Sequence, residues 1–463
     1  MNEEMRKRSL GGLGLMVFLL GVAFCSGGVV LAQGGYTLKD CLGYALEHNR
    51  DIRKSAYDLE KSRYARREVL GALLPQVNGS ANLNDNLKKA KFVMPNFMNN
   101  MLPPNRQDPN ASKYITVEMG TKYTANGGVA LNQQLLNFSL FNALNIAKEA
   151  ERLAALGRES TEEEVIAQTA ALFYGVQSTE YAATQMGKSV ALMERMLRMM
   201  EVNHANGLVK KVDVDRLRVN LTNLRTQESA IANVVAVQKN LLKLQMGLDM
   251  DAELGIVPMD LGAVEQEVGL RPFLPANHTA YRLLSEQERM VGLQRRSAIY
   301  EYLPTLSVML NFQYNGVSDQ FFRGEMNHWY PTSMVGLSLR VPIFSGMSRH
   351  SKVKQSGLEL LKVQEDRRTL EQSLSMAYKN ARAKLGDAHR TIDLQRENQA
   401  LAEEVFEIAQ NNFVLGVASL SDVLNASQSL IQARMSYADA VNDYLKATID
   451  LRKANGTIRE LIN

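Results

Sequence analysis

Two helix-forming stretches of more than 60 residues each restrict the possible folds of this 463-residue chain more than any other feature. They span about residues 142–204 and 349–412, contain no proline, and repeat apolar residues at spacings of three and four. This spacing is typical of an amphipathic helix, and at 1.5 Å per residue each helix would be roughly 90 Å long. Such lengths exceed those of ordinary globular helices, so a long coiled-coil arrangement is expected.

Each long helix is followed by a glycine-bearing turn and a shorter return helix, at about residues 213–247 and 421–455. Apolar residues of the return helices form seams with coiled-coil spacing. The first seam is Leu217, Leu221, Leu224, Ile231, Val235 and Leu242, and the second is Leu424, Ile431, Met435, Ala438, Leu445 and Ile449. Helices at about residues 37–71 and 278–301 could stack end to end on the return helices. A closed helical bundle or a filamentous coiled coil is the alternative.

The sequence contains an internal duplication, because several landmarks recur in the same order. The pairs are Leu74-Pro75-Gln76-Val77 with Leu303-Pro304-Thr305-Leu306, Asn206-Gly207-Leu208 with Leu415-Gly416-Val417, and Gln245-Met246-Gly247 with Ala454-Asn455-Gly456. The last two pairs share one offset of 209 residues, and Asp213 and Asp422 each follow their turn glycine by six residues. Chance is a poor explanation for this agreement.

The duplication predicts two repeats, each with a helix, a strand pair and a long helical hairpin. We expect a signal peptide at residues 1–32, a first repeat at 33–257, an inter-repeat linker at 258–277 and a second repeat at 278–463. The strand pairs are expected at 75–136 and 304–343, and the helical hairpins at 142–250 and 347–456.

The strand pair of the second repeat alternates apolar and polar residues, which places the two kinds on opposite faces of a sheet. The residues predicted to face lipid are Leu306, Val308, Leu310, Phe312, Val335, Leu337 and Leu339. Strands of about 11 residues can cross a membrane when tilted, with Trp329-Tyr330 in an interfacial aromatic girdle. A soluble antiparallel sheet with one buried face has the same period and is the alternative.

The first strand pair is less regular. Its return strand is expected to run from Ile115 through Tyr123 and to change register near Gly127-Gly128. The segments at 86–112 and about 316–330 are rich in turn-forming residues, so they are expected to be exposed external loops.

The N-terminus indicates export. Arg6-Lys7-Arg8 precede an apolar run from about Leu10 to Leu31, and Val30-Leu31-Ala32 would permit cleavage before Gln33. An uncleaved membrane anchor is the alternative. The bulky residue before Cys25 argues against a lipoprotein cleavage box.

Beyond the signal peptide, no run of about 18 apolar residues occurs, so strands would have to carry the mature protein across a membrane. Open sheet edges are forbidden in lipid, and the four strands of one chain cannot close a useful barrel. We therefore expect the chain to oligomerise, with three copies supplying about twelve strands.

Composition and motifs argue against other functional classes. Hydrophobic residues make up 45% and charged residues 22% of the chain, so disorder is not expected. The net charge of +4 is spread thinly, which argues against nucleic-acid binding. The histidines lack metal-ligand spacing, and there is no phosphate loop or nucleophile elbow, so neither an enzyme nor a cofactor is expected. Four methionines of the first long helix are interpreted as packing residues: Met193, Met196, Met199 and Met200.

Several ordered motifs point to one family. They are Tyr36-Thr37-Leu38-Lys39-Asp40-Cys41 with Ala45-Leu46-Glu47-His48-Asn49, Leu74-Pro75-Gln76-Val77, Val341-Pro342-Ile343-Phe344-Ser345-Gly346, and residues 416–426. In these motifs the sequence resembles the TolC-type outer membrane factor family over essentially all of the mature chain. The resemblance implies a homotrimer with a twelve-strand β-barrel in the bacterial outer membrane and a twelve-helix tunnel through the periplasm. It also implies docking on a periplasmic membrane-fusion adaptor and an inner-membrane pump or ABC exporter, without bond chemistry.

The resemblance also implies a periplasmic gate at the two turns between long and return helices. Asp213 and Asp422 match the acidic gate positions of the family, and six such carboxylates in a trimer would favour cations. Asn425 belongs to the same ring, where many relatives have a further aspartate. Ala418 stands where a basic latch residue can occur, so Lys210 and Lys211 are the replacement candidates, by pairing with Asp422.

Helix capping is the alternative role for both aspartates. The turn glycines are expected to end the long helices in the left-handed conformation. The turn residues that would contact the adaptor in this family are Gly207, Leu208, Gly416 and Val417.

The leading functional interpretation is the outer-membrane channel of a tripartite efflux pump that exports small molecules. The first alternative is the outer-membrane channel of a type I polypeptide secretion system. The second is a non-conducting coiled-coil scaffold of the cell envelope.

Overall fold

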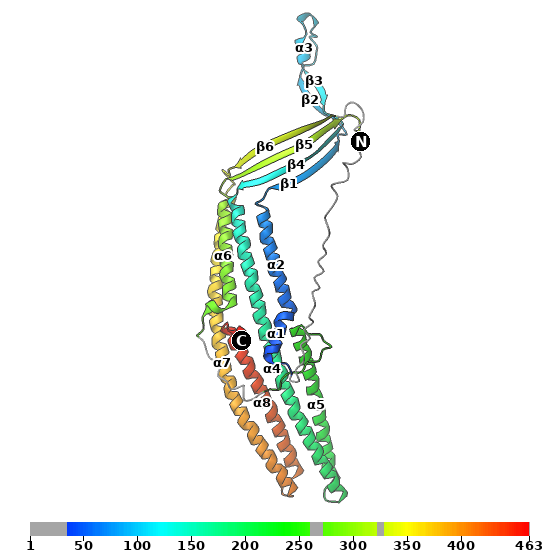
Figure 1. Cartoon of the computed structure of the whole chain (residues 1–463), viewed down its shortest axis with the longest axis vertical. Coiled ribbons are helices and arrows are strands. Elements are labelled where there is room, and N and C mark those ends of the chain that lie inside the picture. Colours follow the sequence, from blue (N-terminus) through cyan, green and yellow to red (C-terminus); the bar gives the residue numbers. More distant parts are fainter. Residues whose placement is uncertain (1–34, 260–271, 322–327, 463) are drawn as a thin grey trace, which may run out of the picture.

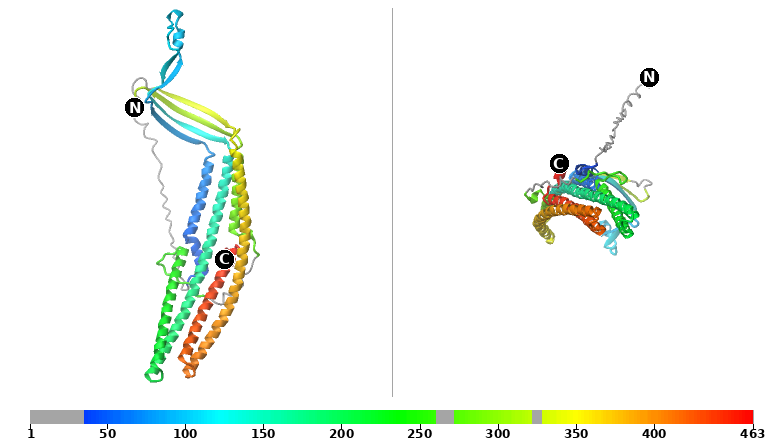
Figure 2. Two further views of the ribbon diagram at one scale, coloured as in Figure 1. Left: turned by 180° about the vertical axis from the view of Figure 1, so that it is seen from behind. Right: turned by 90° about the horizontal axis from the view of Figure 1, so that it is seen from below.

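The computed structural model describes residues 35–259, 272–321 and 328–462. The molecule is a long column of helices that carries a β-sheet at one end, and a small hairpin projects beyond the sheet (Figure 1). Seen along the column, the helices form a curved layer (Figure 2). The predicted signal peptide, the centre of the linker at 258–277 and the tip of the second external loop lie outside the described residues.

Both repeats contain an initial helical segment, two strands of one sheet and a long helical hairpin, but the first also carries an inserted strand-helix-strand segment and has its initial helix divided in two. The first contains α1 (Leu38–His48), α2 (Arg50–Gly71), β1 (Gln76–Asp85), β2 (Ala90–Pro95), α3 (Phe97–Met101), β3 (Tyr114–Met119), β4 (Tyr123–Leu136), α4 (Phe138–Ala205) and α5 (Lys211–Met246). The second contains α6 (Thr279–Tyr300), β5 (Thr305–Ser318), β6 (His328–Arg340), α7 (Ser348–Val414) and α8 (Leu420–Ala454). Short 3-10 turns lie at Pro104–Arg106, Pro275–Asn277 and Ile458–Leu461.

The two long helices are even longer than expected. Helix α4 has 68 residues and α7 has 67, so each spans roughly 100 Å. Helix α4 begins at Phe138, because the side chain of Asn137 accepts a hydrogen bond from the Leu140 N–H at 3.1 Å and caps the first turn.

The sheet formed by the described strands has the order β1-β4-β5-β6 and is antiparallel throughout. The described neighbours cover only one side of β1 and one side of β6, which leaves both strands as sheet edges. Each of the four strands continues directly from or into a helix of the column (Figure 1).

The structure corrects the prediction for the first strand pair. Residues 114–119 do not begin the return strand; as β3 they pair with β2 in a separate hairpin. Gly120, with φ of +106°, separates β3 from β4, and a left-handed backbone there ends the first strand. The predicted register change at Gly127-Gly128 is also wrong, since β4 pairs with β1 without a shift from Tyr123 to Asn132.

The predicted helix at 37–71 is divided at Asn49, whose side chain accepts hydrogen bonds from the N–H groups of Asp51 and Ile52 and starts α2. The division places α1 and α2 on the end of the return helix α5. The Asn49 Nδ2 atom donates to the Gln245 carbonyl at 2.7 Å. The same junction forms in the second repeat, where the backbone at Asn277 approaches Gly456 at the end of α8. The expected end-to-end stacking is therefore present in both repeats.

The lower helices share one apolar core. Residues of both hairpins meet in this cluster, and both predicted seams contribute to the protein interior. Three of the four methionines of α4 are buried, as a packing role requires, whereas Met199 is partly exposed.

Gly247 provides a test of the junction between α5 and α1. Its φ is +76°, and a Cβ atom there would lie 2.5 Å from the His48 carbonyl oxygen. Gly207 has nearly the same φ, +75°, but a Cβ atom there would meet no heavy atom within 4 Å. We expect Gly207→Ala to destabilise the protein by about 1 kcal/mol through backbone strain alone. Gly247→Ala should lower the free energy of unfolding by about 1–3 kcal/mol more than Gly207→Ala does, because its Cβ atom would also clash with the His48 carbonyl. Equal midpoints of thermal unfolding for the two variants would contradict this packing.

Candidate functional site

The two turns between long and return helices lie together at the end of the column opposite the sheet (Figure 1). Gly207 and Gly416 both have φ of +75°. The Gly207 N–H donates to His204 O at 2.9 Å and the Leu208 N–H to Asn203 O at 2.9 Å, and residues 416 and 417 repeat this pattern. These are Schellman caps, so the predicted left-handed helix ends are confirmed.

The second tip contains a complete capping box. The Ser419 hydroxyl accepts a hydrogen bond from the Asp422 N–H at 3.3 Å, and the Asp422 carboxylate accepts bonds from the Ser419 hydroxyl at 2.7 Å and N–H at 2.9 Å. The hydroxyl bond, followed by the backbone bond, lowers the pKa of the Asp422 carboxyl below its usual range. Helix capping is therefore a real function of Asp422.

The first tip differs, although Asp213 holds the same position in its helix. The N-cap residue of α5 is Lys210, and its side chain makes no capping hydrogen bond. The Asp213 carboxylate has a long ion pair with Arg216, 3.9 Å between Oδ1 and a guanidinium nitrogen. Helix capping thus accounts for the carboxylate of Asp422, whereas the carboxylate of Asp213 takes part in no capping box.

The proposed latch is not formed inside one chain. Lys210 and Lys211 are both exposed, and no ion pair with Asp422 occurs in the part of the chain that the structure describes. Asn425 is exposed one turn beyond Asp422, and residues three apart lie on one helix face. The latch remains a prediction, and it would have to form between neighbouring subunits.

The tips also expose large apolar side chains. Leu208 is 73% and Val417 is 78% exposed. Sequence reasoning selected these two residues and missed their neighbours, which are Val202, Val212, Val414 and Leu415. The missed residues could have been found from their apolar character next to a turn glycine, where a monomer would normally carry polar residues.

The sheet brings the seven predicted lipid-facing residues onto one face. Leu306 pairs with Leu339, Val308 with Leu337, and Leu310 with Val335. The first repeat extends the same apolar face through Val77, Leu83, Val129 and Leu131. Val335, Leu337 and Leu339 are 74%, 69% and 63% exposed, so this face lacks cover within the chain.

The opposite face of the sheet is lined mostly by amides and hydroxyls. Asn82 donates to Asn126 at 3.0 Å, Gln313 donates to Asn315 at 2.7 Å, and Asn315 donates to Thr332 at 3.0 Å. A wet surface suits such a face, whereas a lipid surface would not.

Of the two residues predicted to form an aromatic girdle, Trp329 and Tyr330, only Trp329 lies on the apolar face of the sheet. Successive strand residues point to opposite faces, so Trp329 lies on the apolar face, over Gly316, and Tyr330 lies on the polar face. Tyr123 and Tyr314 share the apolar face with Trp329.

Other site types find no support in the described parts of the chain. No group of three His, Cys, Asp or Glu residues there could hold a metal ion. None of the helices there is both long enough and apolar enough to span a membrane.

The difference between the two tips can be measured by hydrogen exchange. Ser419→Ala removes the N-cap, so the first-turn amides of α8 should exchange roughly fivefold faster, equivalent to about 1 kcal/mol. Ser421→Ala, at a neighbouring exposed position, is the control. Conversely, Lys210→Ser supplies the missing cap partner of Asp213 and should slow exchange at the start of α5.

The pH dependence has a defined sign. Folding lowers the pKa of Asp422. The stability that its capping carboxylate gives to the folded state is therefore fully present above the ordinary aspartate pKa, and it is lost as the pH falls through the lowered value. Identical exchange in wild type and Ser419→Ala at neutral pH would contradict the capping assignment.

Comparison with known proteins relates this chain to one protein family. The sequence matches the family described as outer membrane efflux protein over residues 41–248 and 289–457. Outer membrane protein TolC of Escherichia coli (strain K12) is 21% identical over 430 residues, which cover 89% of this chain and 80% of TolC. Alkaline protease secretion protein AprF of Pseudomonas aeruginosa is 27% identical over 219 residues, which cover 43% of this chain and 44% of AprF.

The fold agrees with these sequence relations. The crystal structure of the Campylobacter jejuni CmeC outer membrane channel matches with a TM-score of 0.69 at 16% identity, covering 91% of this chain and 85% of that chain. The family match spans both repeats and most of the chain. The protein therefore belongs to the outer membrane efflux protein family, a TolC-like family of channels of the bacterial outer membrane.

Proposed function

We propose that three copies of this chain form one channel, with a twelve-strand β-barrel in the outer membrane and a twelve-helix tunnel below it. The observation that carries the proposal is the sheet, which has one apolar face and two open edges. Lipid offers no hydrogen bonds to an open edge, so β6 of one subunit would pair with β1 of the next until the barrel closes.

The helical layer supports the same assembly. In its lower part α4 packs on α5 and α8, and α8 packs on α7, so α5 and α7 form the outer edges. Exposed apolar stripes follow both edge helices. They are Val234, Val237, Leu241 and Leu244 on α5, and Leu394, Leu401, Val405 and Ile408 on α7. Packing of α7 on α5 of the neighbouring subunit would cover both stripes and close a ring.

The exported cargo is proposed to be small molecules, moved together with a periplasmic membrane-fusion adaptor and an inner-membrane transporter. The family match to efflux proteins supports this cargo over both repeats. The likeness to a protease secretion protein covers only 43% of the chain, so polypeptide secretion is the second candidate. In both cases the protein would conduct solutes and catalyse no reaction.

Docking and gating are assigned to the tips. The exposed apolar residues around Leu208 and Val417 would be covered by the adaptor. Three copies each of Asp213, Asp422 and Asn425 would surround the pore, with Lys210 and Lys211 as cross-subunit latches to Asp422. The carboxylate of Asp213 supports the ring, because helix capping does not account for it.

Single-channel recording in planar bilayers tests the function. Purified wild-type protein should conduct, with cations preferred. Asp213→Asn with Asp422→Asn removes six charges per trimer and should lower the cation-to-anion permeability ratio by about threefold or more, because a narrow ring of carboxylates concentrates cations. The control, Asp108→Asn with Glu118→Gln, removes as many carboxylates near the external hairpin.

A complete lack of conductance would favour the coiled-coil scaffold and contradict the channel. Conductance with unchanged ion selectivity in the tip variant would remove the gate ring while leaving the channel intact. Restoration of drug resistance, rather than of polypeptide secretion, in a strain without its own channel would separate the two cargo classes.

Two neighbouring residues test which face meets lipid. Leu337→Arg places a charge on the apolar face and should cost about 2–4 kcal/mol per subunit at the membrane midplane. The yield of assembled protein in the outer membrane should therefore fall. Ser338→Arg places the same charge on the polar face, so assembly should persist while conductance changes. The opposite ranking would reverse the assignment of the faces.

A further inference from the structure

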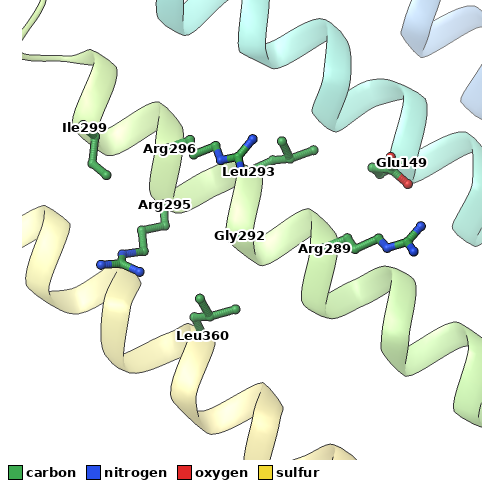
Figure 3. Close-up of a pocket in the computed structure, with 8 residues that line it drawn as sticks. All are labelled: Glu149, Arg289, Gly292, Leu293, Arg295, Arg296, Ile299 and Leu360. Atoms are coloured by element: carbon green, nitrogen blue, oxygen red, sulfur yellow. The ribbon is translucent and has the colours of Figure 1, made fainter.

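A hollow of about 560 Å³ lies on the flank of α6, between α4 and α7 (Figure 3). Residues of α6 form its floor, and its sides come from Glu149 of α4 and Leu360 of α7. It is distinct from the tips and from the sheet.

A glycine in the second half of α6 forms part of the floor of the hollow. Gly292 follows Arg289 by three residues and precedes Arg296 by four. At these spacings all three residues lie on one face of the helix. A Cβ atom at Gly292 would meet no heavy atom within 4 Å. The missing side chain leaves an open floor flanked by arginines.

The lining carries an excess of positive charge. Three arginines line the hollow, Arg289, Arg295 and Arg296, against the single carboxylate of Glu149. Glu149 already accepts a hydrogen bond from Arg152 at 2.7 Å, and Arg289 pairs with Glu286 at 3.2 Å. Within the described residues, Arg295 and Arg296 have no ion pair.

In lacking ion pairs among the described residues, Arg295 and Arg296 differ from the other charged residues on this part of α6. Nearby charges of α6 are neutralised by the adjacent helices, as in Arg282 with Glu159 at 2.9 Å and Glu288 with Arg367 at 2.7 Å. The two exposed neighbours Arg295 and Arg296 are therefore free to bind an external anion. Guanidinium groups match the paired oxygens of phosphate, sulfate and carboxylate.

The remaining lining is apolar. Leu293, Ile299 and Leu360 line the hollow beside the arginines (Figure 3). Apolar walls with a few charged groups are typical of sites for small amphipathic ligands. We propose that this hollow binds an amphipathic anion, a phosphate, sulfate or carboxylate group attached to an apolar body.

Isothermal titration of the full-length protein in neutral detergent with decyl phosphate tests the proposal. We expect saturable binding of one ligand per chain, and no competition from decyltrimethylammonium. Arg295→Gln with Arg296→Gln should weaken binding about tenfold or more, because both unpaired guanidinium groups are lost. Arg195→Gln with Arg198→Gln removes two arginines from the lower part of α4 and should leave the affinity unchanged.

A second variant tests the shape of the site without changing its charge. Gly292→Leu fills the floor and should abolish binding while the protein still folds, since the added side chain begins in open space. Gly386→Leu is the matched control on α7, where a Cβ atom also meets nothing within 4 Å. Absence of saturable binding, or equal binding by wild type and both pocket variants, would overturn the proposal.

The anion could come from a membrane phospholipid or from an exported solute. Protein in nanodiscs of phosphatidylglycerol and in nanodiscs of phosphatidylcholine separates the two sources. Loss of decyl phosphate binding only in phosphatidylglycerol would support the site and assign a lipid headgroup to it. Equal binding in both lipids would support the site and assign it to soluble amphipathic anions.

Discussion

A sheet inside a lipid bilayer has no water to satisfy the N–H and C=O groups of its outer strands. In this chain β1 and β6 are such strands, and the apolar face of the sheet is exposed over all four strands. In the membrane location proposed for this sheet, both edges would need another chain to continue the pairing. This requirement governs the rest of the molecule, because every strand of the sheet is joined directly to a helix of the column.

Closure of the barrel would determine the arrangement of the helices below it. Helices α2, α4, α6 and α7 connect to the four strands, so a ring of strands would place their upper ends in a ring as well. The return helix α5 ends at the junction between α1 and α2, and α8 ends where α6 begins. Close backbone contacts at Gly247 and Gly456 form these two junctions. The duplicated sequence thus produces two similar halves, whose tips share one apolar core.

The features repeated most often along the chain were the ones that the sequence could predict. Apolar spacing over more than 60 residues identified α4 and α7, and strict alternation placed Leu337 and Ser338 on opposite faces. The hairpin of β2 and β3 was missed because alternation continues on both sides of Gly120, and only the positive φ of that glycine separates the strands. Asn49 divided a helix for a similarly local reason, the capping bonds of one side chain.

In the candidate sites, too, some features were predictable from the sequence pattern and others depend on local interactions. The turn glycines were predictable from their position alone. The different environments of Asp213 and Asp422 depend on the N-cap residue, because Ser419 makes a capping hydrogen bond and Lys210 does not. The hollow over Gly292 could not be predicted, because it depends on the pairing of charges between α4, α6 and α7. Spacing along one helix identifies a shared face, but not which charges on it remain without partners.

The central claim is that one chain supplies a third of a closed barrel. Native mass spectrometry of the protein released from outer membranes in mild detergent tests this claim directly. The mass of three chains, without smaller or larger closed assemblies, is the result expected from the four-stranded sheet of the described residues. A stable monomer, dimer or tetramer that retains channel conductance would contradict it.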